Sequence, residues 1–242
     1  TPVLPTGYTC EKDVELPEIY VRVGVANVAL GVQEDVLDVT FNDNGSGGNS
    51  MDDNEMKKAI EAALTGKIKA NITTIKLTAS GVTEITGYDW RYLLERYERD
   101  SDWNNLTVLD LSAMTNLKTM RNDTNIISYI ITKLQTLALP NNLGQIGSNA
   151  FTACDNLELQ TLPDSVTQIG YEAFSNCTSL ALQSLPDGLT QIGDGAFCGC
   201  ERLKLQSLPK DLTQIGNYAF YGCERLKLQS LPDGLPQIGE YA

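Results

Sequence analysis

The side chains that could do chemistry are few, and the most regular of them are cysteines. Four of the six cysteines recur at one constant interval: Cys154, Cys177, Cys200 and Cys223. Because buried cysteine behaves as a small apolar residue, this spacing predicts a column of structural free thiols. Disulfides between neighbouring members are the alternative, since adjacent rungs lie about 4.8 Å apart. Cys198 falls outside the interval and is expected to be more exposed, and Cys198 with Cys200 alone is weak evidence for a metal.

Catalysis has little support in the composition. The chain has no histidine, which removes the commonest general base and every Ser-His or Cys-His nucleophile. Asp100 and Asp102 form a close carboxylate pair, but solvated turn residues explain them better in a chain with 31 acidic residues. The glycines are spread along turns and are not gathered in a phosphate-binding loop. We expect no enzyme activity, no cofactor and no metal.

The cysteine interval is part of a repeat that covers residues 139–242. Phenylalanine and the pairs Ile-Gly and Leu-Pro keep the same interval, and each pair occurs five times at that interval. Self-similarity at a period of about 23 residues indicates a solenoid, in which each coil buries its apolar face by stacking on its neighbours. Within one coil we expect a strand over residues 157–162 ended by Pro163, and a core position for Phe174. Gly170 is expected to supply a dihedral or a close approach that a side chain would forbid.

The repeat pattern Leu-Pro-x-x-Leu-x-x-Ile-Gly-x-x-Ala-Phe-x-x-Cys-x-x-Leu resembles the BspA-like leucine-rich repeat family of bacterial surface proteins. The match is full over residues 139–228 and partial to residue 242. This resemblance implies an α/β solenoid, a right-handed leucine-rich repeat with short parallel strands. It also implies a secreted or cell-surface location and adhesion to host proteins or other bacteria. It implies no catalytic residue.

Composition and charge agree with a secreted binding protein. With 242 residues, 42% of them apolar, the chain can bury a substantial core along the solenoid axis. The net charge of −13 argues against nucleic acid and anionic lipid, which require clustered Lys and Arg. No apolar run reaches ~18 residues, so we expect no membrane insertion. Because the chain starts at Thr1 without a charged, apolar leader, we expect a mature or trimmed chain whose targeting segment has been removed.

The first half of the chain is expected to differ from the regular repeats. Residues 1–41 should form an N-terminal β segment, because apolar residues alternate over residues 18–25 and 36–41. The role of this segment and of Cys10 is not set by the sequence. Residues 42–50 have the Gly, Asn and Ser content of a flexible linker.

Residues 51–103 are expected to form a helical cap and a first irregular coil. A helix should start at Asp52 or Asp53 and end at Gly66, with the side chains that share one face recurring every four residues: Met56, Ile60 and Leu64. A second helical face is expected over residues 89–97.

Residues 104–242 should form the leucine-rich repeat solenoid, with regular repeats from about residue 139. The Leu-x-x-Leu-x-Leu rhythm of its strands already appears over residues 72–77, 106–111 and 134–139, so the solenoid begins before its regular repeats do.

The primary functional hypothesis is a non-catalytic, extracellular or cell-surface protein-binding and adhesion module. Its partner would be a host matrix protein or another bacterial surface protein. We expect the binding face to be a flat, uncharged column of small hydroxyls: Thr161, Ser184, Ser207 and Ser230. Neighbouring positions vary in charge, as partner-specific positions would, although simple solvation explains them as well: Glu158, Ala181, Lys204 and Lys227.

The alternative is a glycan-binding surface module that uses tyrosines for ring stacking. The candidates lie beside the Ile-Gly turns: Tyr171, Tyr218 and Tyr241. Aromatic clustering on one exposed edge would favour this function. We interpret these tyrosines as lying in alternate repeats and not side by side, which favours protein binding.

Two further expectations concern packing. One position of the repeat holds glutamine in the regular coils, at 160, 183, 206 and 229. In the coil before them the same position holds Leu137, which is expected to point inward. Burying an unpaired glutamine amide there would cost ~1–3 kcal/mol. We expect the strand to bulge so that the preceding leucines point inward. The alternative is an inward ladder of Gln amides bonded to one another.

The last coil has no polar cap, so we expect either end-to-end self-association around residues 228–231 or a solenoid that continues in a longer native protein.

Overall fold

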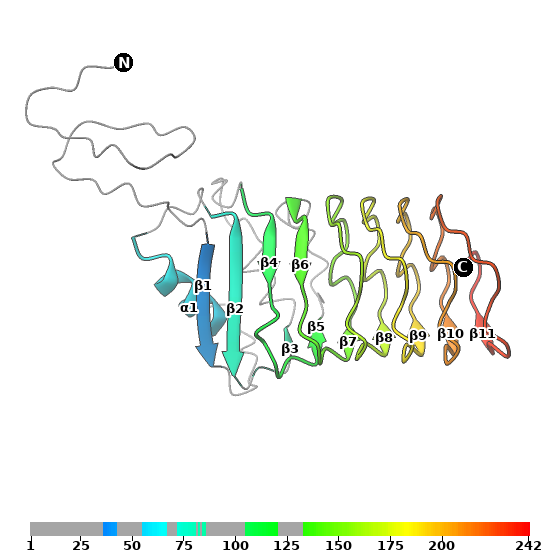
Figure 1. Cartoon of the computed structure of the whole chain (residues 1–242), viewed down its shortest axis with the longest axis horizontal. Coiled ribbons are helices and arrows are strands. Elements are labelled where there is room, and N and C mark those ends of the chain that lie inside the picture. The colour runs from blue at the N-terminus through cyan, green and yellow to red at the C-terminus, as the bar shows by residue number, and fades with distance from the viewer. Residues whose placement is uncertain are drawn as a thin grey trace, which may run out of the picture. The chain divides into compact units, whose positions relative to one another are not determined.

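The computed structural model describes residues 36–42, 55–66, 72–80, 82, 84–85, 105–120 and 133–242. The chain divides into two units, Thr1–Glu34 and Asp35–Ala242, and all described residues belong to the second. The second unit is a solenoid whose coils follow one another along one axis (Figure 1). The strand expected over residues 18–25, the linker after residue 42 and the second helix over residues 89–97 lie outside the described residues. Cys10, Asp100 and Asp102 do so too.

One side of the solenoid carries a four-stranded parallel sheet in the order β1-β2-β4-β6. Its strands are β1 (Val36–Asn42), β2 (Thr74–Ser80), β4 (Val108–Asp110) and β6 (Thr136–Ala138). The leucines and isoleucine that meet in register are buried: Leu37, Ile75, Leu109 and Leu137. These strands confirm the ones expected from the Leu-x-x-Leu-x-Leu rhythm. Since β1 pairs with β2 along its whole length, this sheet begins at Val36, well before residue 104.

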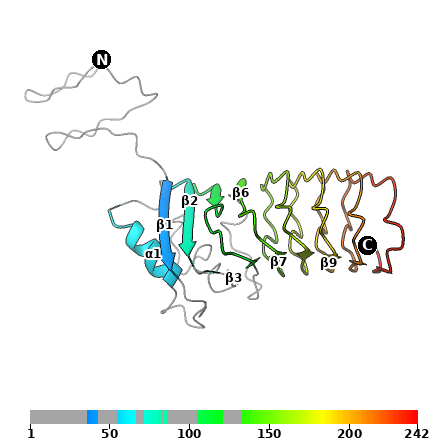
Figure 2. The ribbon, with the colours of Figure 1, turned by 60° about the horizontal axis from the view of Figure 1, so that its bottom comes forward.

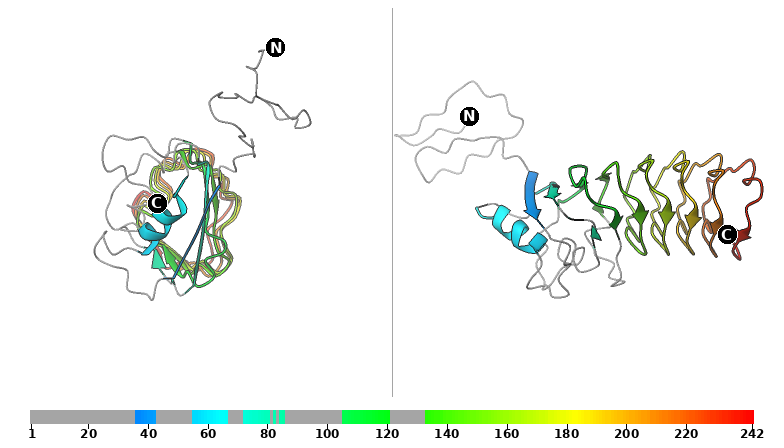
Figure 3. Two further views of the ribbon diagram at one scale, coloured as in Figure 1. Left: turned by 90° about the vertical axis from the view of Figure 1, so that its left-hand side faces the viewer. Right: turned by 90° about the horizontal axis from the view of Figure 1, so that it is seen from below.

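A second parallel sheet has seven strands in the order β11-β10-β9-β8-β7-β5-β3. Each strand is only two residues long: β3 (Glu84–Ile85), β5 (Thr119–Met120), β7 (Gln145–Ile146), β8 (Gln168–Ile169), β9 (Gln191–Ile192), β10 (Gln214–Ile215) and β11 (Gln237–Ile238). From β7 onward the strand is the Gln-Ile pair of the repeat, and its isoleucine is buried as far as β10. The coils overlay when seen along the axis, and the turned view shows the same stacking (Figures 2 and 3).

The strand expected over residues 157–162 is not formed. Leu157 and Leu162 are buried, but Gln160 and Thr161 are both exposed, so the alternation that a strand requires breaks between them. The equivalent segment of the next coil approaches this one through Gln183 N, which donates to Gln160 O at 3.4 Å. The regular repeats therefore place their β structure on the Gln-Ile pair, and the expected strand is an extended segment that continues the face of the four-stranded sheet.

The core of the regular coils is built from columns of identical residues. The phenylalanine rings stack along the axis with centroids 5.4, 5.6 and 5.4 Å apart, in the order Phe151, Phe174, Phe197 and Phe220. The cysteine column lies beside them, and Cys154, Cys177 and Cys200 are buried free thiols. This confirms the predicted column of structural thiols.

The thiols also make a hydrogen bond that the sequence did not predict. Cys177 Sγ donates to the carbonyl oxygen of Phe151 at 3.0 Å, and the same bond recurs one coil later from Cys200 Sγ to Phe174 at 3.1 Å. Cys223 Sγ repeats it to Phe197 at 3.1 Å. Each thiol therefore ties its coil to the one before.

The glycine of each Ile-Gly pair allows a close approach between coils. A Cβ on Gly170 would lie 2.7 Å from the backbone nitrogen of Ser148, and one on Gly216 would lie 2.3 Å from the nitrogen of Asp194. Neither glycine has a positive φ. Of the two expected roles, close approach is thus the one the structure shows.

The helix α1 (Glu55–Ala63) precedes β2 and packs against the core. Ile60 is fully buried, and Leu64, whose amide donates to Ile60 O at 2.9 Å, is half-buried. Gly66 has φ +78°, the left-handed conformation of a helix C-terminus, as the sequence predicted. Across the described residues, no helix has the length and apolar content needed to cross a membrane.

Candidate functional site

The hydroxyl column predicted from the sequence is exposed. Thr161, Ser184, Ser207 and Ser230 all lie at the surface, each next to an exposed glutamine of the same coil. We name these eight residues the polar strip: Gln160, Thr161, Gln183, Ser184, Gln206, Ser207, Gln229 and Ser230. None of them carries a charge, and all sit on the segments that continue the four-stranded sheet.

The polar strip forms because leucine, and not glutamine, turns inward. Leu182 and Leu205 are fully buried, and Leu159 and Leu228 are half-buried, whereas the glutamine after each leucine is exposed. This confirms the expectation that the leucines point inward and excludes an inward ladder of Gln amides at these positions, although the segment forms no strand and so no bulge. The physical reason is that an exposed amide keeps its bonds to water while leucine gains by leaving it.

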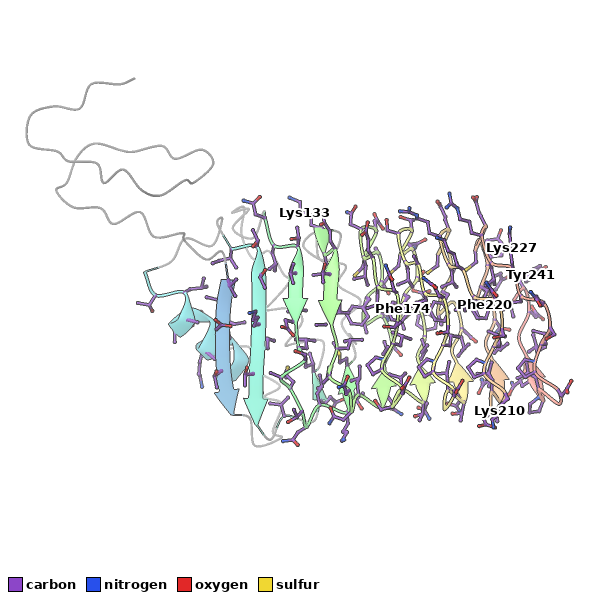
Figure 4. All side chains as sticks on the ribbon, in the orientation of Figure 1. Lys133, Phe174, Lys210, Phe220, Lys227 and Tyr241 are labelled. Atoms are coloured by element: carbon purple, nitrogen blue, oxygen red, sulfur yellow. The ribbon has the colours of Figure 1, made fainter. Side chains whose placement is uncertain are left out.

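The charged positions beside the polar strip are also at the surface. Glu158, Lys204 and Lys227 are exposed, and Ala181 is half-buried. Lys227 lies on the outside of the coils, whereas Phe174 and Phe220 lie within them (Figure 4). Along these four coils the position is negative at Glu158, neutral at Ala181 and positive at both Lys204 and Lys227.

The tyrosines form a second surface feature, and here the expectation of separated rings was wrong. Tyr218 and Tyr241 occupy equivalent positions of successive repeats, so they lie in adjacent coils, and their rings stack with centroids 5.1 Å apart. The rings of Tyr221 and Tyr218, which belong to the same coil, meet in a T-shaped arrangement with centroids 5.8 Å apart and an interplanar angle of 76°. These three rings are 45%, 68% and 57% exposed in the order Tyr218, Tyr241 and Tyr221.

We name Tyr171, Tyr218, Tyr221 and Tyr241 the tyrosine edge. Tyr171 is 48% exposed but precedes Tyr218 and Tyr221 by two coils and Tyr241 by three, and it makes no ring contact with them among the described residues. Sequence reasoning missed Tyr221. It occupies the slot that Cys198 fills one coil earlier, so the repeat alignment carried the signal.

The stacked tyrosines lie in a column whose backbone has the left-handed conformation in every regular coil. The φ angles are +54°, +47°, +61°, +53° and +54° for Asn149, Glu172, Gly195, Tyr218 and Tyr241. Hydrogen bonds between coils hold this turn: Gly195 N donates to Asn217 O and Tyr218 N donates to Glu240 O, both at 2.8 Å. A left-handed conformation costs a non-glycine residue roughly 1–2 kcal/mol, so these bonds offset a real strain.

Side chains next to this column continue the bonding from coil to coil. The Asp194 carboxylate accepts a hydrogen bond from Asn217 N at 2.8 Å, and the Asn217 side-chain oxygen accepts one from Glu240 N at 2.8 Å. The last coils are therefore in fixed register, which is why the two tyrosine rings meet.

The tyrosine edge carries negative charge from Glu172 and Asp194. The Glu172 carboxylate accepts a hydrogen bond from Tyr171 and, with its charge and that of Asp194, raises the pKa of Tyr171. Burial raises the pKa of Cys198, and the charge of Glu172 raises it further. Cys198 is partly exposed, as expected for the cysteine outside the interval. Within the described part of the chain, no group of three or more His, Cys, Asp or Glu side chains is placed to hold a metal ion.

Stacked coils with parallel strands, columns of leucine, isoleucine and phenylalanine, and an exposed repeating strip define a leucine-rich repeat protein. Residues 112–242 match the family model described as the BspA type leucine-rich repeat region, in six copies. The matched range is more than half of the chain, and the chain belongs to this family.

The fold is shared with a solved structure. The crystal structure of a leucine-rich repeat protein from T. pallidum is similar with a TM-score of 0.51 and 23% identity, over 86% of this chain and 87% of that chain. A leucine-rich repeat protein from Bacteroides ovatus is similar with a TM-score of 0.44 and 22% identity, over 70% of this chain and 46% of that one. No curated protein matches the sequence significantly. The likeness to the T. pallidum protein shows the fold alone.

Proposed function

We propose that this chain is a secreted or cell-surface module of a bacterial protein that binds a protein partner, such as a host matrix protein or another bacterial surface protein, without catalysis. The observation that carries this proposal is the polar strip. Its eight side chains are exposed on four successive coils, and none of them is charged. Membership of a leucine-rich repeat surface-protein family supports the same function.

The polar strip has one property of the centre of a protein interface, because none of its eight side chains is charged. Protein interfaces are depleted of charged residues at the core and keep polar groups at the rim. Small hydroxyls let a partner backbone approach closely, and neighbouring amides can donate and accept hydrogen bonds. The flanking Glu158, Lys204 and Lys227 would lie at the rim, where charges set specificity and association rate more than affinity.

Glycan binding is the second candidate function, and the clustered rings of Tyr218, Tyr221 and Tyr241 are the observation that favours it. Exposed aromatic faces are what a sugar ring packs against. Two features rank it below protein binding. The rings of Tyr218 and Tyr241 cover one face of each other, and carboxylates border the same edge.

An array of host matrix proteins, bacterial surface proteins and glycans, probed with the purified chain, tests the proposal. We expect retention on one or more proteins, including after enzymatic removal of their glycans. Retention only on glycans, or loss of all binding after deglycosylation, would contradict a protein-binding function and establish the second candidate.

A further inference from the structure

The column that carries Tyr218 contains one position without a side chain. Glu172, Gly195 and Tyr218 occupy this column in three successive coils. Glu172 N donates to Asp194 O at 2.9 Å and Gly195 N donates to Asn217 O at 2.8 Å, which sets that order. Tyr241 covers one face of the Tyr218 ring, with centroids 5.1 Å apart. The other face points along the column toward the glycine. We name this position the Gly195 gap.

Glu172 borders the gap from the opposite side to Tyr218. Its Cγ atom would lie only 3.1 Å from a Cβ placed on Gly195, so its side chain leans over the glycine. Its charge reaches both neighbours at this edge, because it raises the pKa of Tyr171 and that of Cys198. Asp194 adds a second negative charge that acts on Tyr171.

The spacing of the coils gives the size of group that fits. Rungs about 4.8 Å apart place the backbones of Glu172 and Tyr218 about 10 Å from each other. The ring of Tyr241, one coil beyond Tyr218, lies 5.1 Å from the Tyr218 ring. A flat group at the same spacing on the other face, level with Gly195, would lie within the roughly 6 Å over which a cation is attracted to a ring face. The same group lies within reach of the Glu172 carboxylate.

We propose that the Gly195 gap binds an arginine side chain of the protein partner, with its guanidinium on the free face of Tyr218 and paired with the Glu172 carboxylate. A guanidinium is planar, stacks on aromatic rings and pairs with carboxylates, whereas an ammonium is a compact point charge. This inference rests on the proposed function and specifies the partner as one that presents a basic segment. The net charge of −13 attracts such a segment at long range.

Charge decides between this ligand and a sugar. A carboxylate can accept hydrogen bonds from sugar hydroxyls, but a neutral sugar gains nothing from the surrounding negative charge. A guanidinium gains from the charge of Glu172, from that of Asp194 and from the ring. The observations at this edge therefore favour a cationic side chain of a protein.

The test uses the full chain and a short peptide of alternating glycine and arginine, with a peptide in which citrulline replaces arginine as the neutral control of the same shape. Binding is followed by the amide chemical shifts of the chain in solution. We expect the arginine peptide to shift the amides of Gly195 and Tyr218, and the citrulline peptide to leave them unchanged. Added salt should weaken binding by screening the exposed charges.

Variants at the gap have matched controls. Y218N and G195N keep a backbone that the column accepts, since Asn149 has the same conformation at the equivalent position. Y218N and E172Q should each weaken the arginine peptide about two- to fivefold, and the double variant about tenfold. G195N should weaken it by filling the gap. D211N, which removes one exposed charge, and G234N, a glycine with φ +76° and open space around it, should leave the affinity unchanged.

Several outcomes would overturn the proposal. Equal binding of the citrulline peptide, or equal weakening by D211N and E172Q, would show general attraction to an acidic surface. Shifts of the same amides by neutral oligosaccharides, without an effect of arginine, would assign the edge to glycans. If Y218N does not fold by circular dichroism, E172Q at the same edge carries the test. Because the readout is at the tyrosine edge, its result is independent of whether the polar strip binds a partner.

Discussion

At the scale of single residues, glycines show where adjacent coils touch. A Cβ on Gly193 would lie 2.7 Å from the carbonyl carbon of Gly170 and 2.8 Å from the nitrogen of Tyr171. Both atoms are backbone, so they cannot move aside without shifting the coil. Gly188 in the same coil has its nearest neighbour 3.9 Å away, so the two glycines differ in space although they share a repeat.

We therefore expect G193A to destabilise the chain by about 1–3 kcal/mol, the usual cost of overpacking. G188A should change the stability by less than about 1 kcal/mol and can raise it by restricting the unfolded chain. Urea denaturation followed by circular dichroism measures both. Equal midpoints for the two variants would show that the coils do not meet at Gly193 as described.

At the scale of an element, the thiol column connects each coil to the previous one. Burial raises the pKa of Cys177 and Cys200 and raises that of Cys223 to about 12. Since burial disfavours the thiolate, the folded chain holds these protons more tightly than the unfolded chain does. The stabilisation is fully present below the ordinary thiol pKa of 9.0 and is lost as pH rises toward the folded values.

Stability should thus fall steeply above pH 9, by about 1.4 kcal/mol per pH unit for each buried thiol. The double variant C177A/C200A will be less stable at neutral pH, because it leaves space in the core. Between about pH 8 and pH 10, its free energy of unfolding should fall by less than that of the parent chain. Lysine and tyrosine ionisation affects both proteins, so the difference between them measures the contribution of the two thiols. If the stability of the two proteins fell by the same amount over this pH range, the buried thiols would not be the cause of the fall.

The elements also show what the sequence could predict. Periodicity identified the coils, the thiol column and the inward leucines, because each depends on which side chains recur at the same place. Periodicity did not locate the strand. Residues 157–162 have strand composition, but the successive exposed Gln160 and Thr161 break the alternation, and the two-residue strands fall at Gln-Ile. Hydrogen bonds between backbones decide strands, and a residue pattern reports them only indirectly.

The sequence predicted the exposed hydroxyl column correctly but did not predict the contact between the tyrosines. Each hydroxyl of the column lies between leucines that point inward, as Thr161 lies between Leu159 and Leu162, so the sequence was sufficient to predict its exposure. The contact between Tyr218 and Tyr241 depends on the register of neighbouring coils. That register is visible in the sequence only when both tyrosines are counted from the Ile-Gly pair of their own repeats. Tyr221 and the Gly195 gap needed the stacked structure.

At the scale of the whole molecule, repetition separates two kinds of surface on one solenoid. The polar strip is neutral and continues over four coils, whereas the tyrosine edge is acidic, aromatic and concentrated toward the last coils. A solenoid offers such surfaces because each coil adds one side chain to every column. We propose that the partner makes its main contact with the polar strip and a single arginine contact with the tyrosine edge.

The most direct test of the binding function compares bulky substitutions on two faces of the same solenoid. S184W and S207W place large side chains on the polar strip, and Q191W places one at an exposed position of β9, in the same coil as Ser184. Affinity for each protein retained on the array is measured with the three variants and the parent chain. We expect S184W and S207W to weaken binding at least about tenfold, as clashes at the centre of an interface do, and Q191W to bind as the parent chain does. Unchanged affinity for S184W and S207W, or equal weakening by Q191W, would show that the polar strip is not the binding site.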